Sequence, residues 1–141
     1  MEEVNKLSVI VPTFNRRFLL PRTIKSLVDQ SYKNIEILVV NDGGEDVSDI
    51  INNFNDKRIR YFYKKNGGLA SARNVALKNI SGQVISLLDD DDIYLPYTVE
   101  MRMYMMNKIG ADIIYSRSLK DIWEKSDGGY VSVSKVLYWH H

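Results

Sequence analysis

Residues 35–44 read Ile35-Glu36-Ile37-Leu38-Val39-Val40-Asn41-Asp42-Gly43-Gly44, an apolar run that ends in a polar turn. A strand that is nearly continuous in apolar residues is typical of a parallel sheet covered by helices on both faces. Asparagine, aspartate and glycine are residues that end strands and form turns. The segment therefore predicts a central strand with an acidic loop at its carboxyl end.

Further strands and helices alternate along the chain on both sides of this segment. Apolar β-rich runs predict strands at 7–11, 59–63, 84–88 and 112–115, and apolar residues at helical spacing predict helices within 16–30, 47–54, 69–80 and 97–109. This alternation is the pattern of an α/β fold with an open, mostly parallel, Rossmann-like sheet. Right-handed crossovers give its first four strands the order 3-2-1-4. Turn residues at 126–129, between apolar runs at 119–123 and 130–133, predict a short hairpin near the end of the chain.

The composition narrows the class of protein. The 141 residues are 45% hydrophobic, and we expect 1–141 to form a single domain. Nineteen basic and eighteen acidic residues leave a net charge of +1, so no global field attracts nucleic acid. The lack of cysteine excludes disulfides and thiolate sites. The sequence contains no secretory signal and no apolar run near the ~20 residues of a membrane span, which predicts a cytoplasmic protein. Peripheral membrane attachment through partner enzymes is compatible with this, and His140-His141 is assigned no chemical role.

Four consecutive aspartates, Asp89-Asp90-Asp91-Asp92, directly follow an apolar strand. Like charges this close repel and raise one another's pKa, and a bound cation removes that cost. Carboxylate oxygens are hard ligands that suit Mg²⁺ or Mn²⁺. The alternative is a solvated acidic turn that caps the following helix, and the run alone does not separate the two interpretations. The loops at Thr13, Asp42 and 89–92 all belong at the carboxyl edge of the sheet, near the switch point where ligands bind, which favours the metal.

Four strings in this order resemble the motifs of the family 2 glycosyltransferases, which have the GT-A fold. They are Val9-Ile10-Val11-Pro12-Thr13-Phe14-Asn15-Arg16, Val39-Val40-Asn41-Asp42-Gly43, Asn66-Gly67-Gly68-Leu69-Ala70-Ser71-Ala72-Arg73-Asn74 and Leu88-Asp89-Asp90-Asp91-Asp92. The resemblance covers roughly residues 7–109. Each string alone is weak evidence, but four in the family's order and spacing are specific.

The resemblance implies a role for each matching residue in binding a nucleotide-sugar donor. Substrate contacts are implied for Pro12, Thr13, Phe14, Asn15, Asp42, Gly43, Gly68, Arg73, Asp89 and Asp90, and a metal contact for Asp91 together with Asp89. Phe14 would offer its ring to the nucleobase, Asp42 would accept a hydrogen bond from uracil, and Arg73 would approach the diphosphate. The alternatives are core packing for Phe14, an ordinary turn at 42–44 and an unpartnered surface arginine at position 73. Asp92 is left as a candidate cap of the next helix.

The function that the resemblance implies is sugar transfer from a nucleoside diphosphate sugar, UDP-linked by family analogy, to an acceptor hydroxyl, as in polysaccharide biosynthesis. It implies dependence on Mn²⁺ or Mg²⁺ and inversion at the anomeric carbon, with a carboxylate general base that the family places well beyond the aspartate motif. The chain ends 49 residues after Asp92, and none of Asp121, Glu124 and Asp127 lies in a matching context. The catalytic base is therefore left unassigned. A noncatalytic fragment that binds the donor is the alternative, and self-association through 113–139 is expected from an incomplete sheet edge.

Two other classes of protein also combine an α/β sheet with an acidic metal site. A nucleotidyltransferase would carry a glycine- and base-rich loop after its first strand, where this chain has Pro12-Thr13-Phe14-Asn15. A response-regulator receiver domain would carry a phosphoacceptor aspartate after its third strand, where this chain has Lys64-Lys65. Neither pattern is present, so both classes are disfavoured.

Overall fold

The computed structural model describes residues 5–115, 119–126 and 129–136. The chain divides into two compact units, Met1–Met101 and Arg102–His141. The assignment of 1–141 to a single domain stays a prediction.

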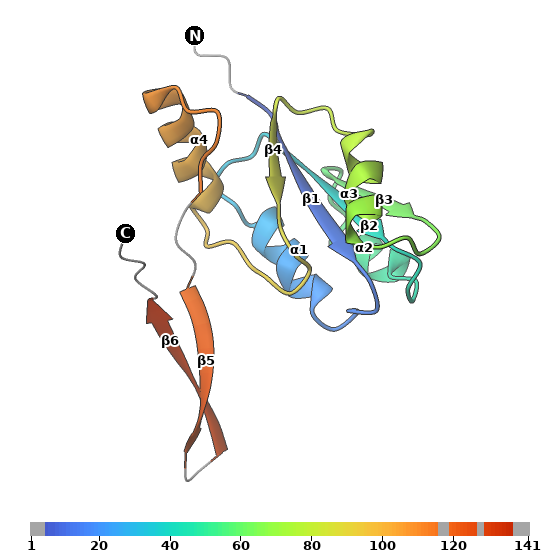
Figure 1. Cartoon of the computed structure of the whole chain (residues 1–141), viewed down its shortest axis with the longest axis vertical. Helices are drawn as coiled ribbons and strands as arrows, with labels where there is room; N and C mark the ends of the chain where they lie inside the picture. The colour runs from blue at the N-terminus through green and yellow to red at the C-terminus, as the bar shows by residue number, and fades with distance from the viewer. Residues whose placement is uncertain (1–4, 116–118, 127–128, 137–141) are drawn as a thin grey trace. The chain divides into compact units, whose positions relative to one another are not determined.

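A four-stranded parallel sheet forms the centre of the first unit (Figure 1). Its strands are β1 (Leu7–Thr13), β2 (Ile35–Asn41), β3 (Ile59–Tyr63) and β4 (Val84–Leu87), in the order β3-β2-β1-β4. The predicted order 3-2-1-4 and the α/β class are confirmed. The helices are α1 (Leu20–Val28), α2 (Ser48–Phe54), α3 (Leu69–Leu77) and α4 (Thr98–Ile109).

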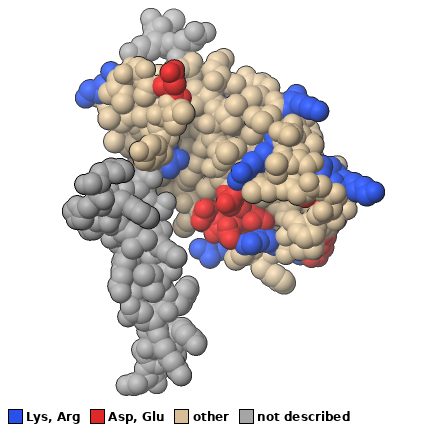
Figure 2. Space-filling model, viewed as in Figure 1, with Lys and Arg blue, Asp and Glu red and all other residues tan. Residues whose placement is uncertain are grey.

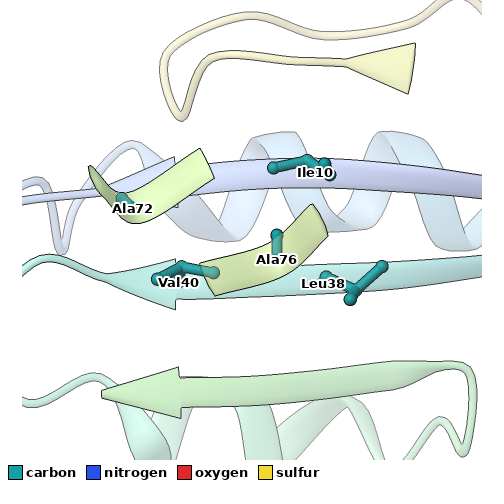
Figure 3. Packing of buried hydrophobic residues seen from close by; sticks show 5 residues of the cluster. All are labelled: Ile10, Leu38, Val40, Ala72 and Ala76. Carbon is teal, nitrogen blue, oxygen red and sulfur yellow. The ribbon is translucent and has the colours of Figure 1, made fainter. Parts of the chain in front are cut away.

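The two central strands are buried along their whole length, as their continuous apolar sequence predicts. In Figure 3, α3 lies in front of β1 and β2, and α1 lies behind them. Ala72 and Ala76 of α3 pack against Ile10, Leu38 and Val40. Because alanine is small, the α3 backbone can approach the sheet closely. The sheet is thereby a rigid base for the loops at its carboxyl edge.

The hairpin predicted near the end of the chain is confirmed. Strands β5 (Leu119–Ser126) and β6 (Gly129–Val136) pair antiparallel, from Leu119 opposite Val136 to Ser126 opposite Gly129. They are longer than predicted, and turn residues 127–128 lie outside the described residues.

The prediction of a strand at 112–115 is wrong, because these residues have no regular secondary structure. Ile113 and Tyr115 are 81% and 87% exposed, so this apolar run packs against no surface formed by the described residues. β-propensity depends on such packing. The helix that precedes the run ends as predicted, with Gly110 at a φ of 63°.

Within the described ranges, the structure contains no helix with the length and apolar character needed to cross a membrane. Self-association through 113–139 stays a prediction, since part of that segment and His140-His141 lie outside the described residues.

Candidate functional site

A cleft of about 380 Å³ opens at the carboxyl ends of β1, β2 and β4. It is lined by Pro12, Thr13, Phe14, Arg16, Asp42, Asn66, Gly68, Leu69, Ala72, Asp89, Asp90 and Asp91. Figure 2 shows Asp and Glu side chains gathered in one patch of the surface, with Lys and Arg side chains beside it. Residues nearly eighty positions apart in the sequence therefore meet in one cleft, as expected at the switch point of such a sheet.

Asp42 is held by three hydrogen bonds immediately after β2. Its Oδ1 accepts from Lys64 Nζ at 2.6 Å and from the Gly67 N–H at 3.1 Å, and its Oδ2 accepts from the Gly68 N–H at 2.7 Å. Burial alone would raise the pKa of this carboxyl, but Lys64 and the two N–H donors outweigh burial and lower the pKa. Asp42 is therefore ionised and fixed in position, which an ordinary exposed turn would not require.

The same contacts fix the N-terminus of α3. Gly68 is the N-cap of α3 with a φ of 88°, a conformation that favours glycine. Its N–H and that of Gly67 both donate to Asp42. These two residues therefore tie the loop before α3 to the end of β2.

The aspartates after β4 have different environments. Asp89 accepts a hydrogen bond from Arg73 Nη2 at 3.1 Å, Asp90 is buried, and Asp91 pairs with Arg16. Burial raises the pKa of Asp90 above its ordinary value. The predicted interpretation of position 73 as an arginine without a partner is wrong. Arg73 reaches the site through Asp89 and is not itself among the lining residues.

Asp92 does not cap a helix, because α4 begins six positions later at Thr98. Its N–H donates to the Asp89 carbonyl at 3.1 Å and its own carbonyl accepts from Thr23 Oγ1 at 2.7 Å. These bonds form a turn that anchors the aspartate run to α1.

The end of β1 supplies a ring and a hydroxyl to the cleft. Phe14 is 48% exposed, so its predicted alternative of core packing is wrong. Thr13 is buried, and its Oγ1 has no hydrogen-bond partner of good geometry among the described residues. It lies close to Asp90, where it offsets part of the rise in pKa that burial causes. A buried hydroxyl without a partner is costly. A polar ligand group in the cleft would remove that cost.

Asn15 and Gly43, predicted as substrate contacts, are not among the lining residues and instead shape the neighbouring loop. Asn15 has a φ of 53°, and its Oδ1 accepts from the Glu45 N–H at 2.8 Å. Gly43 has a φ of 83°, and a Cβ at this position would lie 2.5 Å from the backbone N of Asn66.

Gly43→Ala is expected to lower the free energy of unfolding by about 2 kcal/mol or more, because it adds both a left-handed strain and a backbone clash. Urea denaturation measures the change. Gly68→Ala is the matched control: its φ is also positive, at 88°, but its Cβ would meet nothing within 4 Å, so a smaller loss is expected. Equal losses for the two variants would contradict the clash.

Sequence reasoning missed four lining residues, namely Arg16, Asn66, Leu69 and Ala72. All four lie inside the strings that carry the family resemblance. Their place in these strings is the signal that could have identified them as site residues. The role of Asn66 is clear, since its Nδ2 donates to the Asp42 carbonyl at 3.0 Å. The role of Arg16 depends on a pairing with Asp91 across 75 residues of sequence.

The charges of the cleft bear on whether a metal fits there. No three His, Cys, Asp or Glu side chains of the described ranges converge on a common point where an ion could sit. Mg²⁺ does not need such a group, because it is usually held by one or two carboxylates, water and substrate phosphates. Asp89 and Asp91 are both on the cleft wall and exposed. With the orphaned Thr13 hydroxyl nearby, this donor set fits a hard cation that arrives with a phosphate-bearing ligand.

Comparison with known proteins agrees with this geometry. An uncharacterized glycosyltransferase of Rickettsia conorii is 43% identical over 136 residues, covering 93% of this chain and 22% of the relative. The UDP-Glc:alpha-D-GlcNAc-diphosphoundecaprenol beta-1,3-glucosyltransferase WfgD of Escherichia coli is 34% identical, covering 94% of this chain and 53% of the relative. Staphylococcus aureus TarS 1–349 in complex with UDP-GlcNAc has a TM-score of 0.71 at 29% identity, covering 76% of this chain and 32% of TarS.

The family profile described as Glycosyl transferase family 2 matches residues 8–138, nearly the whole sequence. The chain spans between about a fifth and a half of the length of the two curated relatives. The fold, the motif order and this match agree, and the chain belongs to glycosyl transferase family 2.

Proposed function

We propose that this chain binds a UDP-linked sugar together with Mn²⁺ or Mg²⁺ in the cleft, as the donor-binding part of an inverting glycosyltransferase. The observation that carries the proposal is the convergence of Phe14, Asp42 and the 89–91 carboxylates on one cleft. The TarS structures similar to this chain include complexes with UDP and with UDP-GlcNAc, which supports a uridine nucleotide.

Each side chain has a role that fits its position. The exposed ring of Phe14 offers a face for stacking on the base, and the Thr13 hydroxyl offers a polar contact. Asp42 holds the 64–68 loop and has lone pairs left to accept from the uracil N–H. Arg73 orients Asp89. When bound to Asp91 and Asp89, the divalent cation would act as a Lewis acid toward the leaving diphosphate.

For the acceptor we propose only a chemical class, and for the general base we propose no residue. Relatives of Escherichia coli and Campylobacter jejuni are named for transfer to diphosphoundecaprenol-linked sugars, which supports an acceptor used in polysaccharide biosynthesis. No residue of this chain is assigned as the base that deprotonates the acceptor hydroxyl. Donor binding without transfer is therefore the second candidate. Release of UDP from UDP-glucose with Mn²⁺, measured against binding by calorimetry, separates the two.

A thermal-shift panel of UDP, GDP, CDP and ADP, each with and without Mn²⁺, tests the proposal. At ten times its Kd a ligand stabilises the folded state by about 1.4 kcal/mol, which raises Tm by several degrees. We expect the largest shift for UDP with Mn²⁺ and a loss of the Mn²⁺ dependence in Asp91→Asn. Asp29→Asn is the matched control, since Asp29 is an exposed aspartate that pairs with Lys25 on α1. A panel in which no nucleotide shifts Tm would refute the donor site.

A further inference from the structure

Among the described residues that line the cleft, Arg16 is the basic one. The family resemblance implies no role for it. It follows the positive-φ residue Asn15, and its carbonyl accepts from the N–H groups of Leu19 and Leu20 at 3.0 and 3.1 Å. Its backbone is thus fixed at the entry to α1. From there its guanidinium reaches across the cleft, where Nη1 pairs with Asp91 Oδ2 and Nε lies 3.8 Å from Asp90 Oδ1.

The Arg16–Asp91 pair differs in burial from the Asp42–Lys64 pair. Asp42 and Lys64 are nearly buried, and Asp42 also holds two backbone N–H groups, so that pair cannot open without loosening the loop. The side chains of Arg16 and Asp91 are 47% and 44% exposed. Exposed ion pairs are weak because water solvates both partners when they separate. The Arg16–Asp91 pair can therefore open at little cost.

A guanidinium and a divalent cation in contact with the same carboxylate repel each other, so each weakens the binding of the other. Asp91 Oδ2 is held by Arg16, and Asp91 is the best candidate for the metal ligand under the proposed function. Without a counterion, Asp91 would stand beside the buried carboxyl of Asp90 and the carboxylate of Asp89, and like charges this close repel. Arg16 supplies the positive charge that the site needs when it holds no metal.

We propose that Arg16 is the resident counterion of the metal site: it occupies Asp91 when no divalent cation is bound and releases Asp91 when one enters. The proposal rests on the proposed function, since it takes Asp91 as the cation ligand. Arg16 is then a positioning residue that competes with the metal. Its removal should strengthen metal binding, which is the opposite of what the loss of a ligand would do.

The neighbouring residue gives a matched control. Arg17 carries the same charge one position later, but its guanidinium pairs with Asp49 and lies near Glu45, away from the lining residues. Arg17→Gln removes one positive charge from the same turn and leaves the Asp91 pair intact. A general electrostatic effect would appear in both variants, whereas an exchange at Asp91 appears only in Arg16→Gln.

Calorimetric titration with Mn²⁺ alone, without nucleotide, tests the exchange in the wild-type chain, Arg16→Gln and Arg17→Gln. We expect Arg16→Gln to bind Mn²⁺ about two- to fivefold more tightly than wild type, the range set by an exposed ion pair. Arg17→Gln should change the Kd much less. In an Asp91→Asn background, Arg16→Gln should have no effect, because the contested carboxylate is gone.

The outcomes separate the inference from the function on which it rests. Mn²⁺ binding that is insensitive to Asp91→Asn, or no binding at all, would remove the metal site and the inference together. Mn²⁺ binding that needs Asp91, but is unchanged or weaker in Arg16→Gln, would overturn the inference alone. Equal tightening in Arg16→Gln and Arg17→Gln would also overturn it. Matching Tm values for the variants exclude a folding defect as the cause.

Discussion

Glu36→Gln is expected to lower the free energy of unfolding by roughly 3 kcal/mol at pH 7. Glu36 is buried near the start of β2. It therefore lies at the amino ends of the strands, whereas the cleft lies at their carboxyl ends. Its Oε1 accepts from Ser8 Oγ at 2.6 Å and from the Ser81 N–H at 2.5 Å, and its Oε2 accepts from Ser81 Oγ at 2.9 Å. Lys6 and Arg60 each lie 3.4 Å from Oε2. The charged carboxylate thus joins β1, β2 and the loop before β4.

The pH dependence of stability follows from the same contacts. Burial alone would raise the pKa of Glu36, but hydrogen bonds from Ser8 and Ser81 and the charge of Lys6 lower it to about 2. The ordinary value of 4.5 applies in the unfolded chain. Because the folded pKa is the lower one, the stabilisation is complete above about pH 4.5 and is lost as the pH falls toward 2.

Urea denaturation of wild type and Glu36→Gln between pH 7 and pH 3 measures this effect. The difference between the two proteins should be largest at neutral pH and should shrink as the pH falls below 4.5. Glu45→Gln is the matched control, since the Glu45 side chain is 60% exposed and its nearest cation is 3.7 Å away. A constant difference across this pH range would contradict the ionised state of Glu36.

Asp42→Ala is expected to cost about 3 kcal/mol of stability and to weaken UDP binding at least tenfold. The substitution leaves Lys64, whose side chain is only 18% exposed, without its partner, and it frees the Gly67 and Gly68 N–H groups. Removing one partner of a buried pair leaves an uncompensated charge, which typically costs 3–5 kcal/mol. The loop before α3, which lines the cleft, should then lose its fixed position.

Chemical denaturation and UDP titration on the same samples check both parts of this prediction. The double variant that combines Asp42→Ala with Lys64→Met should recover part of the lost stability, because no buried charge is left unpaired. It should not recover UDP binding. Asp29→Asn again serves as the exposed control. Full UDP affinity in a folded Asp42→Ala protein would show that Asp42 has no part in the donor site.

The parts of the fold that depend on local pattern could be predicted from the sequence. The apolar continuity of β2 gave its central place, and the polar turns after β1, β2 and β4 gave the edge at which the cleft lies. The segment 112–115 has the same local pattern but is irregular, since a strand also needs a neighbour to pair with and a surface to cover. That information is tertiary and is not contained in a four-residue run.

The charge pairs of the cleft could not be predicted in the same way. Arg16 and Asp91 are 75 residues apart, and Lys64 and Asp42 are 22 apart, so neither pair leaves a local signature. The aspartate run suggested carboxylates in need of a metal counterion. In the structure, Asp42, Asp89 and Asp91 each have a basic side chain as partner. The acidity of a sequence segment therefore does not give the net charge of the site that it builds.

The two ends of β2 carry separate charge networks, and their spacing has a practical consequence. Six residues of strand, from Glu36 to Asp42, span about 20 Å at ~3.3 Å per residue. Both carboxylates are buried, so salt screens their interaction little, and at an effective dielectric constant of about 20 two unit charges at this distance interact by roughly 0.8 kcal/mol. Replacing Glu36 should therefore change ligand affinity at the cleft by less than about 1 kcal/mol, well below its expected effect on stability.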